Sequence, residues 1–201
     1  MKKRGRWNKG FTLVELIVVL VILAILAAIL IPQLLGYIDR SKQSQYILDA
    51  KNCMTAMQAQ LTEMYARDSA VGMNDESLVA GNPYGDVSWL GTTEAQKVLA
   101  TADANPYMLI MGLGDYTTYK DTSLHKAYTV FFVAYWPEKE KDPVFFDGTE
   151  WTSEYPWKKS GGNTFTVKGE EIKLQFYFIQ APSKNMSNDW NELKNHLGVK
   201  Q

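Results

Sequence analysis

The chain has 201 residues, 46% of them hydrophobic and 12% aromatic, which is enough to build one sizeable core. Its formal net charge is −1, but residues 1–10 hold five basic residues and no acid. Taking five from 21 leaves 16 basic against 22 acidic residues in the remainder, a net charge of −6. An acidic main part repels nucleic-acid phosphates, so a basic face that binds nucleic acid is not predicted.

Several chemical functions lack the residues that they require. Cys53 is the only cysteine, so no disulfide can form within the chain, and we interpret Cys53 as a small buried apolar residue on a helix. His125 and His196 have no partner at zinc-ligand spacing, so neither a metal site nor a cofactor is predicted. The sequence also lacks G-x-S-x-G and a glycine-rich phosphate loop, so we do not expect an enzyme.

The most informative segment is an apolar run over residues 11–35, in which Glu15 is the only formal charge. As a helix rising ~1.5 Å per residue, the run reaches roughly 37 Å, which exceeds a ~30 Å hydrocarbon core. The basic residues before the run place the N-terminus in the cytoplasm by the positive-inside rule, and residues beyond about 36 outside. The sequence therefore predicts a precursor that crosses the plasma membrane once.

Three interpretations of this segment compete. An ordinary secretory signal peptide fits poorly, because the apolar run is too long and contains an acid. A permanent signal anchor that holds an external, monomeric binding domain explains the length and the flanks. It leaves Glu15 unexplained, although a carboxylate inside a bilayer costs a few kcal/mol. The third interpretation assigns a role to every residue of the segment.

The third interpretation is carried by Lys9-Gly10-Phe11-Thr12-Leu13-Val14-Glu15, which resembles the cleavage motif of the type IV pilin and pseudopilin family. The resemblance implies that a prepilin peptidase cuts between Gly10 and Phe11 and that the new amine of Phe11 is methylated. Glycine before the cut fits this chemistry, because the absence of a Cβ lets the backbone approach the peptidase closely. Pro32 stands where many family members carry a proline that kinks the helix.

Cleavage would create a charge beside Glu15. The carboxylate of Glu15 has no partner within residues 11–35 except the amine of Phe11, and buried charges must be paired. In the family that the motif resembles, this acid pairs with the N-terminus of a neighbouring subunit and fixes the stagger of the helices. Thr12 either assists with its hydroxyl or is solvated or self-bonded. Pro32 removes one helical hydrogen bond, so we expect a kink or local melting there, unless it is an incidental proline at the membrane exit.

A second pattern follows Gly36, where apolar residues recur at spacings of three and four. The spacing predicts an amphipathic helix, so one helix is expected over residues 11–67. A coiled coil is the alternative, but the following domain supplies an apolar surface. The expected buried stripe is Ile47, Ala50, Met54, Met57, Leu61 and Met64. The expected polar outer face is Lys42, Gln43, Asp49, Lys51, Gln58 and Glu63.

The remaining sequence predicts an antiparallel sheet of four or five strands. Residues 69–125 hold turn signals around one helix at 93–102, and the strands are expected at 128–136, 143–146, 149–152, 164–168 and 172–180. The strand over 129–135 is apolar on both faces, so one face is expected to take the long helix and the other residues 69–125. A helix after Ser187 or Asn188 closes the chain. The class is α+β, a long helix on an antiparallel sheet.

These patterns divide the chain into a cleaved leader (1–10), a membrane and assembly helix (11–36) and an extracellular pilin-like domain (37–201). The resemblance implies a subunit of a helical homo-oligomeric filament on the cell surface. Its implied partners are the prepilin peptidase, the inner-membrane assembly platform and minor pilins, and its implied roles are adhesion, motility or DNA uptake. A pseudopilin of a type II secretion system is the alternative. The single cysteine cannot close the C-terminal disulfide loop of many Gram-negative pilins, which favours another lineage or a pseudopilin.

Overall fold

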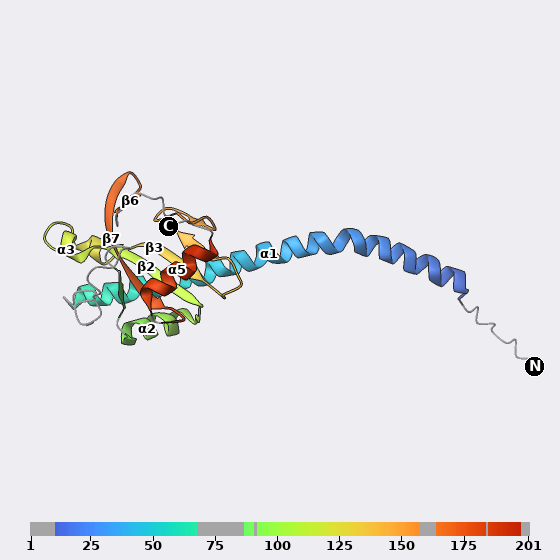
Figure 1. The fold of residues 1–201 in the computed structure, drawn as a ribbon, viewed down its shortest axis with the longest axis horizontal. Helices are drawn as coiled ribbons and strands as arrows, with labels where there is room; N and C mark the ends of the chain where they lie inside the picture. Colours follow the sequence, from blue (N-terminus) through green and yellow to red (C-terminus); the bar gives the residue numbers. More distant parts are fainter. Residues whose placement is uncertain (1–10, 68–86, 91, 157–163, 184, 198–201) are drawn as a thin grey trace, which may run out of the picture. The chain divides into compact units, whose positions relative to one another are not determined.

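The computed structural model describes residues 11–67, 87–90, 92–156, 164–183 and 185–197. The chain divides into two compact units, with the boundary between Ser44 and Gln45. The described part of the first unit is the N-terminal stretch of helix α1 (Leu13–Ala66). The second unit holds the rest of α1, the sheet and the shorter helices (Figure 1).

Helix α1 confirms the prediction of one long helix over residues 11–67. Its apolar N-terminal part is long and apolar enough to cross a membrane. None of the side chains in residues 11–44 is buried within the single chain, so this surface has no partner in the described protein. Pro32 lies inside the continuous helix, and the kink expected there stays a prediction.

The C-terminal part of α1 buries the predicted stripe against the rest of the second unit. Cys53 is also fully buried, which confirms its interpretation as a small core residue. Burial and the nearby carboxylate of Asp49 raise the pKa of the Cys53 thiol to about 12, so the thiol stays protonated and inert at neutral pH. In the stripe, three residues are fully buried and three are half-buried: Ala50, Met57 and Leu61, and Ile47, Met54 and Met64, respectively.

Gln58 corrects one detail of the predicted helix faces. The sequence placed it on the polar outer face, but its side chain reaches the sheet. Its Nε2 donates to the carbonyl of Tyr128 at 2.8 Å, and its Oε1 accepts from the N–H of Val130 at 3.2 Å. The side chain thus joins the long helix to backbone groups where a central strand begins, a position that helical periodicity alone does not reveal.

We expect Gln58→Leu to destabilise the second unit by about 1–3 kcal/mol, because two backbone groups lose their hydrogen-bond partner. Gln60→Leu is the matched control, since Gln60 has no side-chain hydrogen bond in the described part of the protein. Chemical denaturation of the full chain, followed by tryptophan fluorescence, measures both changes. Equal stabilities of the two variants would contradict the role given to Gln58.

Within the described residues the sheet has seven strands, in the order β1-β7-β2-β3-β4-β5, with β6 pairing beside β7. The strands are β1 (Val87–Trp89), β2 (Met108–Gly114), β3 (Val130–Trp136), β4 (Val144–Phe146), β5 (Trp151–Thr152), β6 (Thr164–Val167) and β7 (Glu170–Gln180). The helices other than α1 are α2 (Thr92–Ala102), α3 (Tyr116–Tyr119), α4 (Leu124–Ala127) and α5 (Met186–His196). The α+β class is confirmed, as are the helix near residues 93–102 and the closing C-terminal helix.

The predicted strand number was too low. β2, which the sequence assigned to a turn-rich excursion, lies in the middle of the sheet and pairs antiparallel with β3 and β7. β1 was also missed, and it pairs with β7 in parallel, whereas the other pairings between described strands are antiparallel. Both strands come from residues 69–125, so part of that segment extends the sheet.

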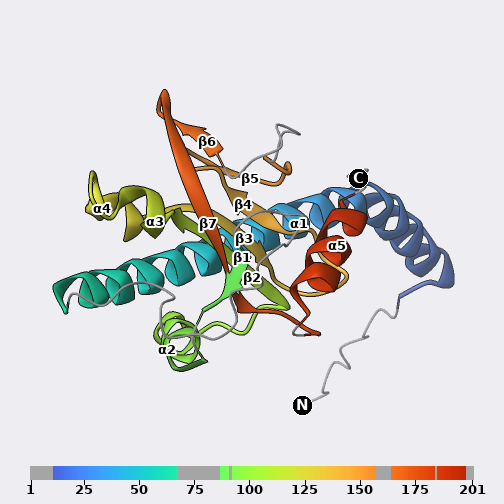
Figure 2. The ribbon, with the colours of Figure 1, turned by 60° about the vertical axis from the view of Figure 1, so that its left-hand side comes forward.

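The second face of the sheet is therefore covered differently from the expectation. Alternate β3 residues face opposite ways. Tyr135 lies near Asp49 of α1, and burial together with that carboxylate raises its pKa. On the other face, Phe132 packs against Phe176, whose ring contacts Trp190 of α5 at 5.9 Å between centroids. Figure 2 shows α5 and the C-terminal part of α1 on opposite sides of the sheet. Strand β2 of the excursion is part of the sheet and does not cover this face.

The two predicted hairpins are present, with one shift in position. The turn between β4 and β5 contains Gly148, whose φ of +91° favours glycine. The turn between β6 and β7 was expected at 169–171 but consists of Lys168 and Gly169, with φ of +51° and +83°. Positive φ at both central residues is typical of a two-residue type I′ turn, which matches the twist of the flanking strands.

Asp115 joins the end of β2 to β7. It is 1% exposed, caps α3 through the N–H of Thr117 at 2.9 Å, and accepts from the ammonium of Lys173 at 2.7 Å. Burial opposes ionisation of the carboxyl, but the hydrogen bonds from Lys173, Thr117 and Thr118 outweigh burial and lower its pKa. Its charged form thus stabilises the fold.

We expect Asp115→Asn to cost about 1–3 kcal/mol of stability at pH 7, because the buried side chain loses its charge-assisted hydrogen bond with the partly exposed ammonium of Lys173. A lowered pKa in the folded state means that the ionised carboxyl stabilises the fold above the unfolded pKa of about 3.9. This contribution disappears as pH falls through the lower folded pKa. Urea unfolding at pH 7 and pH 3 should therefore show a smaller difference between wild type and variant at pH 3. Asp121→Asn, on an exposed residue, is the control, and a difference that does not shrink would contradict this role.

Candidate processing and assembly site

The start of α1 has a defined hydrogen-bond geometry. Leu13 is the first helical residue, so Thr12 precedes the helix. The N–H and the hydroxyl of Thr12 donate to Oε2 of Glu15, at 2.9 and 2.7 Å, and the N–H of Glu15 donates to the Thr12 hydroxyl at 3.3 Å. This reciprocal arrangement is a capping box, in which two helix-end N–H groups are satisfied by side chains.

The capping box corrects the sequence analysis, which left the amine at Phe11 as the only partner of Glu15 within residues 11–35. Thr12 is a partner as well. The sequence did carry the signal, because Thr-x-x-Glu directly before an apolar run is typical of a helix N-terminus. The consequence is that the carboxylate is already turned back towards the helix start. Oε1 of Glu15 has no hydrogen bond among the described residues, so it remains available for a further donor.

Phe11 lies directly before this capping box. It is not helical, and its side chain is 84% exposed. Gly10, the other residue of the expected cleavage site, lies outside the described residues, so the cut between Gly10 and Phe11 stays a prediction. A cut there would place a new amine one residue before Thr12, at the helix end to which the Glu15 carboxylate points.

No metal-binding cluster competes with this site in the described ranges. Within residues 11–67, 87–90, 92–156, 164–183 and 185–197, no group of three His, Cys, Asp or Glu side chains is placed to hold a metal ion. The candidate site is therefore the junction of Phe11, Thr12 and Glu15 with the apolar helix behind it.

Comparison with known proteins supports this assignment of the N-terminus. A family described as "Prokaryotic N-terminal methylation motif" matches residues 8–31. The type IV wide pilus major component of Thermus thermophilus is 32% identical over 118 residues, which cover 48% of this chain and 89% of that relative. Type II secretion system core protein G of Pseudomonas aeruginosa is 34% identical over 112 residues, or 52% of this chain and 75% of that protein. The chain belongs to the type IV pilin and pseudopilin family.

Other similarities to this family are shorter. The type IV major fimbrial protein of Dichelobacter nodosus is 40% identical over 74 residues, or 36% of this chain and 47% of the relative. The chain thus spans about half the length of the major fimbrial relatives that it matches. No solved structure matches the chain. Membership of the family therefore rests on the matched sequences, and it agrees with the α+β arrangement of a long N-terminal helix on a sheet.

Proposed function

We propose that this protein is a structural subunit of a type IV pilus-like extracellular filament. The observation that carries the proposal is the junction of an unpaired apolar helix with the Thr12–Glu15 capping box, inside the segment that matches the methylation motif. Prepilin peptidase cuts after Gly10 and the amine of Phe11 is methylated. Before assembly, the chain crosses the plasma membrane once with residues 1–10 in the cytoplasm, since the basic residues precede the apolar run.

Assembly then uses two features of α1. The apolar side chains of residues 11–35 leave the lipid and pack against the same segments of neighbouring copies, so the helix is covered in the filament as it was in the membrane. Each Glu15 accepts the cationic amine of a neighbour's Phe11 through the oxygen that Thr12 leaves free. A copy that enters with the wrong stagger buries an unpaired charge, at a cost of roughly 3–5 kcal/mol, so the pair sets the register.

The further partners follow from this assembly route. An inner-membrane platform delivers the processed subunit, and minor pilins join the same helical filament. The filament lies on the cell surface and serves adhesion, motility or DNA uptake. A pseudopilin of a type II secretion system is the second candidate, because relatives named as core protein G match the chain as well as pilus proteins do.

Shearing of intact cells tests the proposal. We expect the protein to be the main component of the sheared surface filaments, in electron micrographs labelled with an antibody against its external domain. Recovery only in the membrane fraction, with secretion of other proteins lost in a deletion strain, would favour the pseudopilin. A full-length monomer in the membrane, with neither filaments nor a secretion defect, would instead favour a signal-anchored binding domain.

A further inference from the structure

The uncharged stretch of α1 matches the hydrocarbon core of a membrane closely in length. Residues 16–36, which lie between Glu15 and Tyr37, carry no formal charge. They number 21 (36 − 15) and belong to one continuous helix, so at ~1.5 Å per residue they span about 32 Å, against a core of about 30 Å. When this stretch fills the core, Glu15 and Tyr37 lie at its two boundaries.

The residues directly after the stretch suit a layer of lipid headgroups. This layer is roughly 5–8 Å thick in each leaflet, which corresponds to about three to five helical residues. Tyr37 is 73% exposed, and tyrosine is enriched at membrane interfaces. Arg40 and Lys42 are also exposed, and their side chains have no hydrogen bond or ion pair with the described residues. Together with the acid Asp39 they give residues 37–44 a net charge of +1 (2 − 1).

Arg40 and Lys42 can reach the phosphate groups of such a layer. The Cα–Cβ bonds of an α-helix tilt towards its N-terminus, which for these two residues is the direction of the uncharged stretch. Long basic side chains keep their charged ends at the headgroups while their stems lie along apolar surface. The two residues stand about 200° apart around the helix axis, so no single groove holds both, whereas lipid surrounds a helix on every side.

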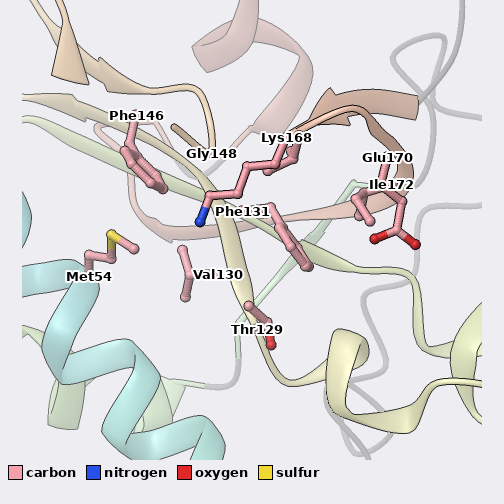
Figure 3. Close-up of a pocket in the computed structure, with 10 residues that line it drawn as sticks. Met54, Thr129, Val130, Phe131, Phe146, Gly148, Lys168, Glu170 and Ile172 are labelled. Carbon is pink, nitrogen blue, oxygen red and sulfur yellow. The ribbon is translucent and has the colours of Figure 1, made fainter. Parts of the chain in front are cut away.

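A lysine of the second unit shows what these two residues lack. Lys168 lines a pocket of about 310 Å³ together with Phe131 and Phe146, and its side chain extends across that pocket, over apolar groups of its own chain (Figure 3). Residues 11–44, among which Arg40 and Lys42 stand, bury no side chain against the described protein. These two basic residues therefore have no partner within it.

We propose that Arg40 and Lys42 bind phospholipid phosphates of the outer leaflet and so fix the depth of α1 in the membrane. This anchor rests on the proposed function, because the membrane-bound precursor is a step of it. At this depth Glu15 lies at the cytoplasmic boundary of the hydrocarbon core, about 33 Å from Tyr37 along the helix. Its carboxylate is hydrated there and bonded to Thr12, so the precursor buries no unpaired charge before assembly.

Labelling of single cysteines measures this depth. The full-length precursor with Cys53→Ala is reconstituted in vesicles of phosphatidylethanolamine and phosphatidylglycerol, with a membrane-impermeant maleimide on both sides. Val18→Cys and Leu34→Cys lie inside the expected boundaries and should be protected. Phe11→Cys and Ser41→Cys lie outside them and should be labelled faster by roughly tenfold or more.

Charge reversal tests the anchor itself. Arg40→Glu with Lys42→Glu repels the lipid phosphates and draws the outer end of the helix out of the headgroups, so labelling at Leu34→Cys should become faster by roughly threefold or more. Lys51→Glu makes the same kind of change on an exposed lysine nine residues after Lys42 (51 − 42), and it should leave the rate unchanged.

The outcomes separate this anchor from the filament. An unchanged rate at Leu34→Cys after charge reversal overturns the anchor, and fast labelling of Val18→Cys or Leu34→Cys alone in the unreversed protein overturns the depth. Neither result touches the proposed function as long as sheared filaments form. Equal labelling of all four positions would show that the helix does not enter the membrane, which overturns that step of the proposed function as well.

Discussion

Filaments should be lost when Glu15 is replaced with glutamine, although the precursor is still cut after Gly10 and stays in the membrane. Glutamine keeps the capping-box hydrogen bonds with Thr12, so the helix start is preserved while the charge is removed. The neighbour's Phe11 amine is then buried without an anion, at a cost of roughly 3–5 kcal/mol per subunit. Sheared filament protein should fall at least a hundredfold, measured by immunoblot against total cellular protein.

Two companion variants separate charge from capping. Glu15→Ala removes both and should assemble no better than Glu15→Gln. Thr12→Ala removes the cap but keeps the carboxylate, and it should cost only about 1 kcal/mol of helix stability, so filaments persist. Filaments at wild-type abundance from Glu15→Gln would show that the acid acts only as a cap. Loss of cleavage in the same variant would mean that Glu15 serves recognition by the peptidase.

The second prediction with a large expected effect concerns cleavage between Gly10 and Phe11. Gly10→Leu should block processing completely, because a branched side chain keeps the scissile backbone away from the peptidase. Membrane insertion should be unaffected, since the basic flank and the apolar run are unchanged. Immunoblots of membrane fractions should therefore show only the longer precursor and no surface filaments.

The leader offers a matched control, because Gly5→Leu makes the same change five residues earlier. That variant should be cut as efficiently as the wild type. A normal-length mature protein from Gly10→Leu would remove the peptidase interpretation. Equal blockage by Gly5→Leu would show a general sensitivity of the leader.

The elements with strong local signals were predictable from the sequence. The long helix was predictable because the apolar run continues into a stripe of apolar residues at spacings of three and four. β3 was predicted from its run of β-branched and aromatic residues. The β4–β5 hairpin was predicted from the turn signal Asp147-Gly148 between two such runs. Cys53 was placed correctly in the core, since it falls on the buried side of the same helix. These predictions depend on neighbours within a few residues, which is the range over which periodicity is informative.

β2 could not be predicted in the same way, because its stability comes from distant partners. It contains two glycines and is apolar at every position, and its hydrogen bonds go to β3 and β7. Gly112 is needed there, since a Cβ would approach the Cβ of Phe132 to 2.9 Å and a ring atom of Phe176 to 3.0 Å. Local propensity treats such a glycine as a turn signal, whereas the packed sheet uses it for close contact.

Some residues of the candidate site were predictable from the sequence, and others were not. Gly10, Phe11 and Glu15 were singled out from a spacing that resembles a family motif, and the family match covers the same residues. An assisting role for the Thr12 hydroxyl was left open, but its capping box with Glu15 was missed, although Thr-x-x-Glu stood in the sequence, because only charged groups were considered as partners for the carboxylate. Gln58 carried no signal at all, since a glutamine on an amphipathic helix is ordinarily solvated. Its partners lie 70 and 72 residues away along the chain.

Intact-mass spectrometry of the protein purified from cell membranes or filaments distinguishes a processed filament subunit from a permanently anchored one. We expect the mass of residues 11–201 with one added methyl group, and fragmentation that places the methyl group on the amine of Phe11. A chain that retains residues 1–10 would contradict processing, assembly through the Phe11 amine and the filament function together.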